Sequence, residues 1–267
     1  MTTTETSTPG SVSVAQDREG LVATIVIDRS AKLNALTLEM LAALDAHLSA
    51  IAESNVRAVV LRTGGEKVFC VGADIGAFSN LSPPEMWRRW IAVGHRVFDR
   101  LAQLPQPTIA VVDGLAVGGG FELALACDFR LAVENARFGL PETGLGTIPG
   151  WGGTGRLTRL VGTSRAKELI LTRRQITAAI ALRWGLVNTV AADRSALEAE
   201  LELFVDDLLG SAPIAQQVSK QLVEAAAVGA PAAVLEAIAS GFTSYTQDFT
   251  QGVSAFLGKT SPRFTAQ

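Results

Sequence analysis

The amino-acid sequence predicts an α/β protein with a helical C-terminal region. Segments rich in β-branched residues, at 22–27, 57–61 and 108–112, are typical of buried strands. Between the first two of these, leucines recur at three- and four-residue intervals from Leu38 to Ile51, which indicates an amphipathic helix packed on a core. From Ala196 to about Gly258 only helical patterns remain. The chain therefore alternates strands and helices first and ends in helices alone.

Bulk composition places the chain among globular proteins and excludes several classes. It has 267 residues, of which 48% are hydrophobic and 18% charged, and a net charge of -3, so nothing favours nucleic acid as a partner. The sequence contains no run of roughly 18 apolar residues, so we predict no membrane-spanning segment. Cys70 and Cys127 form neither a CxxC pair nor a metal motif, which favours a reduced, cytoplasmic setting. We expect no metal site.

Segment boundaries follow from local composition. Residues 1–10 are rich in Thr and Ser, with no basic start and no apolar stretch, so we predict a disordered tail rather than a signal peptide. We assign residues 11–195 to the core that carries the site and residues 196–267 to a helical C-terminal region. Apolar residues occupy more than one face of these last helices, as expected of a surface that packs on a neighbouring subunit.

Capping residues mark the helix starts. Thr37 precedes the first amphipathic helix, Ser82 with Glu85 forms a capping box for a helix that runs to about Leu104, and Thr177 precedes a short helix. The remaining predictions are helices at 152–161 and 164–171, a strand at 187–190, and helix breaks at Pro213, 229–231 and Gly241.

The central stretch, residues 107–160, carries the chemistry. It contains a strand at 108–112, a glycine-rich turn at 114–120 and a helix at 121–127. Glycines at a helix start let the backbone approach a ligand and leave N–H groups that can stabilise a developing oxyanion. Glu122 and Glu142 interrupt this apolar run, and a carboxylate in such surroundings is costly unless it is paired, protonated or used. Each also has a simpler interpretation, because Glu122 suits a helix N-terminus and Glu142 a turn.

The motifs resemble a known family. AVVDGLAVGGGFELALACD, ARFGLPETGLGTIPGWGGTGRL and the upstream KVFCVGADI are similar to the crotonase superfamily, the enoyl-CoA hydratase/isomerase group. The resemblance continues through ALRWGLVNTV to VSAFLGKTSPRF and so covers nearly the whole chain. It implies a crotonase-type β/α spiral core, a C-terminal trimerisation region, a homotrimer or a dimer of trimers, and an acyl-CoA thioester as substrate. Coenzyme A is then part of the substrate, and no further cofactor is implied.

The resemblance also implies roles for individual residues. The N–H groups of Val71 and Gly119 would hold the thioester oxygen, while Glu122 and Glu142 would bind the water that adds to a 2-enoyl-CoA to give a 3-hydroxyacyl-CoA. Residues expected to contact the substrate are Arg29, Lys32, Gly72, Ala73, Asp74, Gly150, Trp151, Phe256 and Lys259. Phe256 and Lys259 would reach the CoA of an adjacent subunit. Asp74 can equally be a helix cap, and Lys259 a solvated surface charge.

Two alternatives stay open. A double-bond isomerase of the same family needs only one carboxyl, so the presence of both glutamates favours a hydratase. A non-catalytic acyl-CoA-binding subunit would not need either. Trp151 stands where many hydratases have a small residue and Gly155 where glutamine is common, so the indole could fill part of the acyl pocket or simply pack. The sequence lacks a phosphate-binding loop, a G-x-S-x-G elbow and a spaced zinc motif.

Overall fold

The computed structural model describes residues 9–267. The strands form two sheets, and the chain passes between them along a spiral path. The predicted tail at 1–10 lies outside the described residues except for its last two. The larger sheet has the order β1 (Ser11–Asp17), β2 (Val22–Asp28), β3 (Ala58–Thr63), β5 (Thr108–Val112), β7 (Phe129–Val133) and β10 (Thr189–Ala191). The smaller sheet has the order β4 (Val68–Cys70), β6 (Leu115–Val117), β8 (Arg137–Gly139) and β9 (Ile176–Thr177).

Each turn of the spiral contributes one strand to each sheet. β3 is followed by β4, β5 by β6 and β7 by β8, and the strands of successive turns pair in parallel within each sheet. Only β1 with β2 and β8 with β9 pair antiparallel among the described strands. Most of these strands are buried, which explains the continuous β-branched and apolar runs of β3 and β5.

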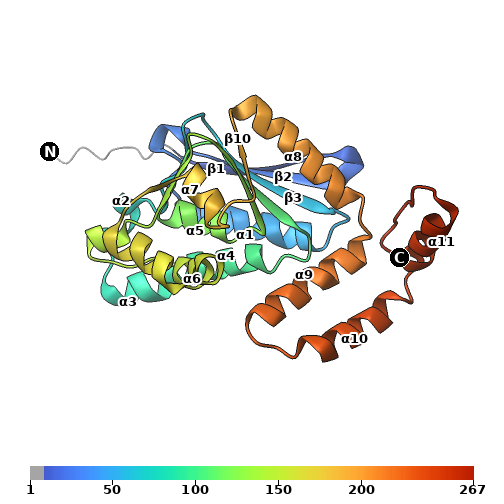
Figure 1. Cartoon of the computed structure of the whole chain (residues 1–267). Helices are drawn as coiled ribbons and strands as arrows, with labels where there is room; N and C mark the ends of the chain where they lie inside the picture. Colours follow the sequence, from blue (N-terminus) through green and yellow to red (C-terminus); the bar gives the residue numbers. More distant parts are fainter. Residues whose placement is uncertain (1–8) are drawn as a thin grey trace.

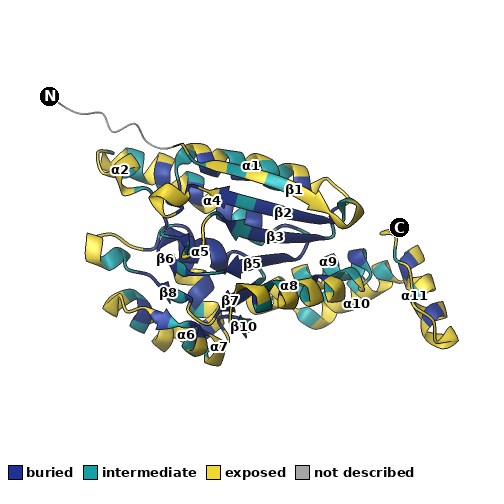
Figure 2. Ribbon diagram, turned by 90° about the horizontal axis from the view of Figure 1, so that it is seen from above, coloured by how far each residue is buried: buried dark blue, intermediate teal, exposed yellow. Residues whose placement is uncertain are grey.

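Helices cover the sheets and extend beyond them (Figure 1). They are α1 (Leu38–Ala52), α2 (Ile75–Phe78), α3 (Pro83–Glu85), α4 (Ala92–Ala102), α5 (Gly119–Leu125), α6 (Gly153–Thr172), α7 (Ala178–Arg183), α8 (Arg194–Leu209), α9 (Pro213–Ala227), α10 (Ala232–Thr243) and α11 (Gln247–Gly258). Every residue of α5 is buried, and Figure 2 shows this helix at the centre of the molecule.

The predicted caps are confirmed. The Thr37 hydroxyl accepts the N–H of Met40 at 3.2 Å, and the Thr177 hydroxyl accepts that of Ile180 at 3.3 Å. The Glu85 carboxylate accepts the Ser82 N–H at 2.9 Å, but the helix that follows is not uniform, because a π-helical turn at Met86–Ile91 separates α3 from α4.

Two local predictions are wrong, and one strand was not predicted. The expected turn at 114–120 contains β6, because Leu115 and Val117 pair with β8. Gly241 does not break a helix, since α10 continues to Thr243. The strand that was not predicted is β1, whose first five residues alternate between exposed and half-buried as in an edge strand.

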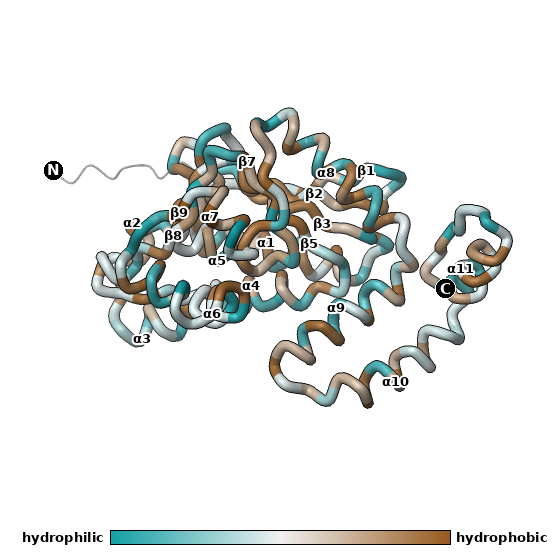
Figure 3. Tube along the Cα trace, viewed as in Figure 1, coloured by the Kyte–Doolittle hydropathy of each residue, from teal (hydrophilic) through white to brown (hydrophobic). Residues whose placement is uncertain are grey.

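The C-terminal helices divide between the core and a projecting arm. Leu197, Leu201 and Val205 bury α8 against the sheet, so the core extends beyond residue 195. From Pro213 the chain leaves the core as α9, α10 and α11, which we call the C-terminal arm (Figure 1). Apolar residues recur along this arm (Figure 3), and several are exposed: Val223, Val234, Ile238, Phe242 and Phe256. Within residues 9–267 no helix is long and apolar enough to cross a membrane.

Candidate active site

Glycines shape the backbone at the N-terminus of α5. Gly118 joins β6 to the helix with a φ of 56° and a ψ of -135°, a conformation that is readily available to glycine alone. Gly72, with a φ of 94°, packs against this turn so closely that a Cβ on it would lie 2.5 Å from the Gly119 nitrogen. The segment after β4 and the start of α5 are thereby brought into direct backbone contact.

Glu122, in the first turn of α5, is fixed by backbone hydrogen bonds. Its side chain is only 2% exposed, and its Oε1 accepts the N–H groups of Trp151 and Gly153, both at 2.8 Å. Burial raises the pKa of Glu122, and these N–H groups oppose the rise. The carboxylate therefore has one oxygen held in place and a proton affinity above that of an exposed glutamate.

Glu142 is in a different environment. It opens a short 3₁₀ helix, Glu142–Leu145, directly after β8, and its carboxylate oxygens are buried. Neither oxygen has a hydrogen-bond partner among residues 9–267. Burial raises the pKa of Glu142 to about 7, and the nearby Glu122 carboxylate adds to the rise. At neutral pH this carboxyl can therefore donate or accept a proton, which suits an acid/base.

Both glutamates face one small cavity of about 100 Å³. Its lining combines the glycine-rich start of α5 with apolar side chains from α2, from the helix before α4 and from the loop before α6. The cavity is lined by Val71, Ala73, Gly118, Gly119, Trp90, Ile91 and Trp151, among others. The predicted catalytic residues are thus brought together.

The second predicted oxyanion donor requires a correction. The Val71 N–H donates to the Leu33 carbonyl at 3.2 Å, so it is already used. Ala73 forms a parallel β-bridge with Leu36: the Leu36 N–H donates to the Gly72 carbonyl, and the Asp74 N–H donates to the Leu36 carbonyl. In this pattern the N–H of Ala73 itself points away from Leu36. In the described part of the chain the N–H groups of Ala73 and Gly119 have no hydrogen-bond partner, and both residues line the cavity.

The expected CoA contact at Arg29 also requires a correction. Its guanidinium is buried, donates to the Ala35 carbonyl at 3.1 Å and pairs with Asp74 at 2.7 Å. Burial raises the pKa of Asp74, but the hydrogen bond and charge of Arg29 outweigh it and keep the pKa below its usual value. Asp74 also caps α2 by accepting the Gly76 N–H. The pair holds two loops together, and Lys32 remains exposed at their edge.

Phe256 and Lys259 lie on α11 and at its C-terminal end. Phe256 is 84% exposed, and Figures 1 and 2 show α11 far from α5 within this chain. Whether they reach the CoA of an adjacent subunit stays a prediction.

Trp151 supports Glu122 as well as lining the cavity. Its ring is buried and packs against Phe98 and Trp90, with centroids 5.2 Å and 5.9 Å away. Its carbonyl accepts a hydrogen bond from Arg156 at 2.8 Å, and Arg156 pairs with Asp99 at 2.5 Å. Neither Arg156 nor Asp99 was predicted to take part in the site. An arginine inside the glycine-rich GWGGTGRL was the available signal, but nothing in the sequence indicates that it is buried.

Comparisons with known proteins identify the family to which this fold belongs. The family model described as enoyl-CoA hydratase/isomerase matches residues 17–267. The chain belongs to this family, within the crotonase superfamily. Within residues 9–267 no group of three or more His, Cys, Asp and Glu side chains is placed to hold a metal ion.

Members of the family match over nearly the whole chain. A short-chain-enoyl-CoA hydratase of Clostridium acetobutylicum is 41% identical, with 92% of this chain and 95% of that protein covered. A crotonyl-CoA hydratase of Syntrophomonas wolfei is 38% identical, with 96% and 98% covered. The crystal structure of an enoyl-CoA hydratase from Bacillus anthracis superposes with a TM-score of 0.91 at 37% identity, covering 96% of this chain and 99% of that one.

Proposed function

We propose that this protein catalyses the reversible addition of water to a 2-enoyl-CoA thioester. The observation that carries the proposal is the contrast between two buried carboxyl groups in one cavity. Glu122 is held by two backbone N–H groups, whereas Glu142 has no hydrogen-bond partner among the described residues and has a pKa of about 7. The residues Gly119 and Ala73, whose N–H groups have no hydrogen-bond partner within residues 9–267, line the same cavity. Acid, base and oxyanion donors are therefore within one small volume.

The steps follow from these positions. The N–H groups of Gly119 and Ala73 donate hydrogen bonds to the thioester oxygen and stabilise the enolate as negative charge develops there; loss of one such donor typically costs about 100- to 1000-fold in rate. Glu122 takes a proton from the water as its oxygen bonds to C3. Glu142 gives its proton to C2, which completes the saturated bond. In the reverse direction the two carboxyls exchange roles.

The names of the relatives support this reaction over isomerisation. Two proteins that match nearly the full chain are named as hydratases of short-chain enoyl-CoA and of crotonyl-CoA. Isomerisation by the same cavity would need only one of the two carboxyls, and the chain has both.

The proposal extends to the protein's surroundings. It includes a homotrimer or a dimer of trimers, because the arm exposes apolar side chains such as Ile238 and Phe242. It includes the cytoplasm, because Cys70 and Cys127 are free thiols. The reaction needs no cofactor beyond the CoA carried by the substrate.

Isosteric substitutions test the assignment. With crotonyl-CoA, Glu142→Gln and Glu122→Gln are each expected to lower kcat by about 100- to 10,000-fold, because an amide cannot transfer the proton. Loss of the conjugated-thioester absorbance reports turnover. Calorimetry with butyryl-CoA serves as the control for binding, which should be retained because the amide oxygen at residue 122 can still accept the N–H groups of Trp151 and Gly153.

Two outcomes would contradict the proposal. One is unchanged hydration in either variant. The other is formation of a conjugated thioester from a 3-enoyl-CoA by a wild-type protein that does not hydrate crotonyl-CoA, which would identify an isomerase.

A further inference from the structure

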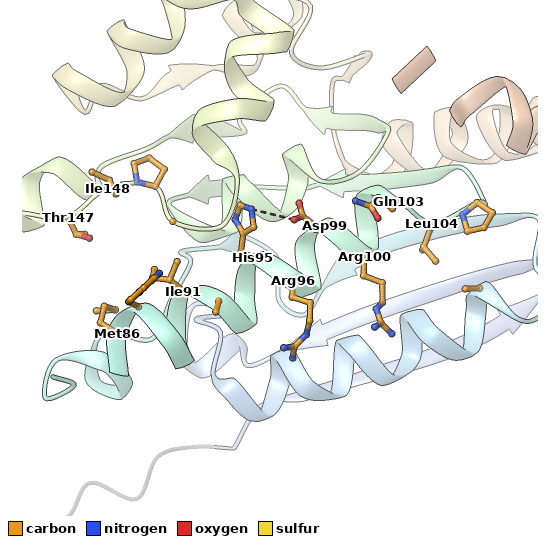
Figure 4. A pocket seen from close by; sticks show the side chains of 16 residues that line it. Met86, Ile91, His95, Arg96, Asp99, Arg100, Gln103, Leu104, Thr147 and Ile148 are labelled. Atoms are coloured by element: carbon orange, nitrogen blue, oxygen red, sulfur yellow. Dashed lines mark ion pairs between the residues drawn. The ribbon is translucent and has the colours of Figure 1, made fainter. Parts of the chain in front are cut away.

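A second, larger cavity lies next to the catalytic one. It is a groove of about 960 Å³ along the outer side of α4 (Figure 4). His95, Arg96, Asp99 and Arg100 line it from α4, and Leu104 follows at the far end. The catalytic cavity has about one tenth of this volume.

The two cavities have five lining residues in common, which form the wall between them. Met86, Ile91, Thr147, Ile148 and Gly150 line both. Figure 4 shows Met86 and Ile91, from the helix before α4, beside Thr147 and Ile148 of the loop before α6. A Cβ on Gly150 would lie 2.6 Å from Ile91 Cδ1, so the Ile91 side chain rests directly on the loop backbone.

Trp90 and Trp151, which also line the catalytic cavity, are held more firmly. Trp90 and Trp151 are each 2% exposed, and a Cβ on Gly94 would lie 2.2 Å from Trp151 Nε1. The Trp151 backbone also holds Glu122. By contrast, Ile91 is half-buried and Ile148 is 70% exposed, so the wall shared with the groove is the side that can give way.

We propose that Ile91, resting on the loop with Ile148, closes the acyl end of the catalytic cavity and restricts the substrate to short acyl groups. This inference depends on the proposed hydration of an acyl-CoA. A volume of about 100 Å³ is well below the roughly 300–1,000 Å³ of typical ligand pockets, which favours a short acyl group. A longer chain has to displace Ile91 to reach the groove.

Chain-length profiles of matched variants test the wall. kcat/KM is measured with the four-, six- and eight-carbon 2-enoyl-CoA esters for the wild type, Ile91→Ala and Trp87→Ala. Trp87 lines only the groove and is 68% exposed, so its truncation serves as the control. We expect the wild type to prefer the four-carbon ester by at least tenfold over the eight-carbon one. Ile91→Ala should raise the eight-to-four ratio at least tenfold, and Trp87→Ala should leave it within twofold.

Ile148→Ala is a second test variant in case Ile91→Ala folds poorly. Ile148 is mostly exposed, so its truncation should be tolerated, and it should shift the eight-to-four ratio of kcat/KM in the same direction. A wild type that accepts both esters equally, or an equal shift in Trp87→Ala, would overturn the inference. Competitive binding of butyryl-CoA and octanoyl-CoA separates it from the proposed function. If Ile91→Ala changes the relative affinity for the two esters but no variant hydrates an enoyl-CoA, the role of Ile91 in limiting acyl length is supported and the proposed hydratase activity is rejected. No shift in affinity would reject the wall.

Discussion

At the scale of residues, the two glutamates show what a sequence can and cannot predict. The residue types, their order and their apolar neighbours were sufficient to single out Glu122 and Glu142. The sequence could not predict that Glu122 is held by backbone N–H groups whereas Glu142 is not. That contrast depends on how the loop from Trp151 to Gly153 packs against Glu122. Val71 and Arg29 illustrate the same limit. Their positions in the motif were recognised, but their hydrogen-bond partners Leu33 and Asp74 come from other segments of the chain.

The proposed mechanism predicts a pH dependence. It requires Glu122 and Glu142 to carry one proton between them, and burial raises the pKa of Glu142 to about 7. As the pH rises through about 7 in the free enzyme, this proton is lost, so kcat/KM should fall toward a tenfold decrease per pH unit. The kcat/KM values for hydration and for dehydration should fall together, because the ratio of the two values is the equilibrium constant, which does not depend on pH in this reaction. The measurement is kcat/KM from pH 6 to 9 in both directions, and a profile that stays flat to pH 9 would contradict it.

At the scale of elements, the glycines of α6 have separate roles. The helix was predicted as two pieces, and Gly162, with a φ of 79° and a ψ of 164°, does interrupt it. At its N-terminus, a Cβ on Gly153 would lie 2.8 Å from Glu122 Oε1, whereas a Cβ on Gly155 would meet nothing within 4 Å. The sequence could mark both as glycines in a motif, but only the packing of α6 on α5 distinguishes them.

This difference gives a paired prediction for α6. Gly155→Ala should stabilise the protein by roughly 0.5–1 kcal/mol, because alanine favours the helix and nothing obstructs its methyl group. Gly153→Ala should displace the Glu122 carboxylate and lower kcat for crotonyl-CoA at least tenfold. Denaturant unfolding measures the first effect and the hydratase assay the second. Equal activity in the two variants would show that the position of Glu122 does not depend on this close contact.

At the scale of the whole molecule, the division into a core and a helical region was predicted, but its boundary was not. The helical pattern begins near residue 196, yet α8 packs on the sheet and only the arm from Pro213 projects (Figure 1). Periodicity shows that a helix has an apolar face, but it does not show which surface covers that face. The arm is attached to the core by Lys220, which binds Asp128 and the Gln106 carbonyl at 2.7 Å and 3.0 Å.

The exposed face of α10 predicts how the arm is used. This helix has no buried residue, and Val234, Ile238 and Phe242 follow one another at four-residue intervals with exposures of 58%, 67% and 60%. Apolar side chains aligned in this way are typical of an interface, so Ile238→Asp should dissociate the proposed trimer by placing a charge in it. Ser240→Asp adds the same charge to another face of α10 and should leave the assembly intact. Sedimentation velocity compares the three proteins. A monomeric wild type, or equal dissociation by both variants, would mean that this face is not the contact between subunits.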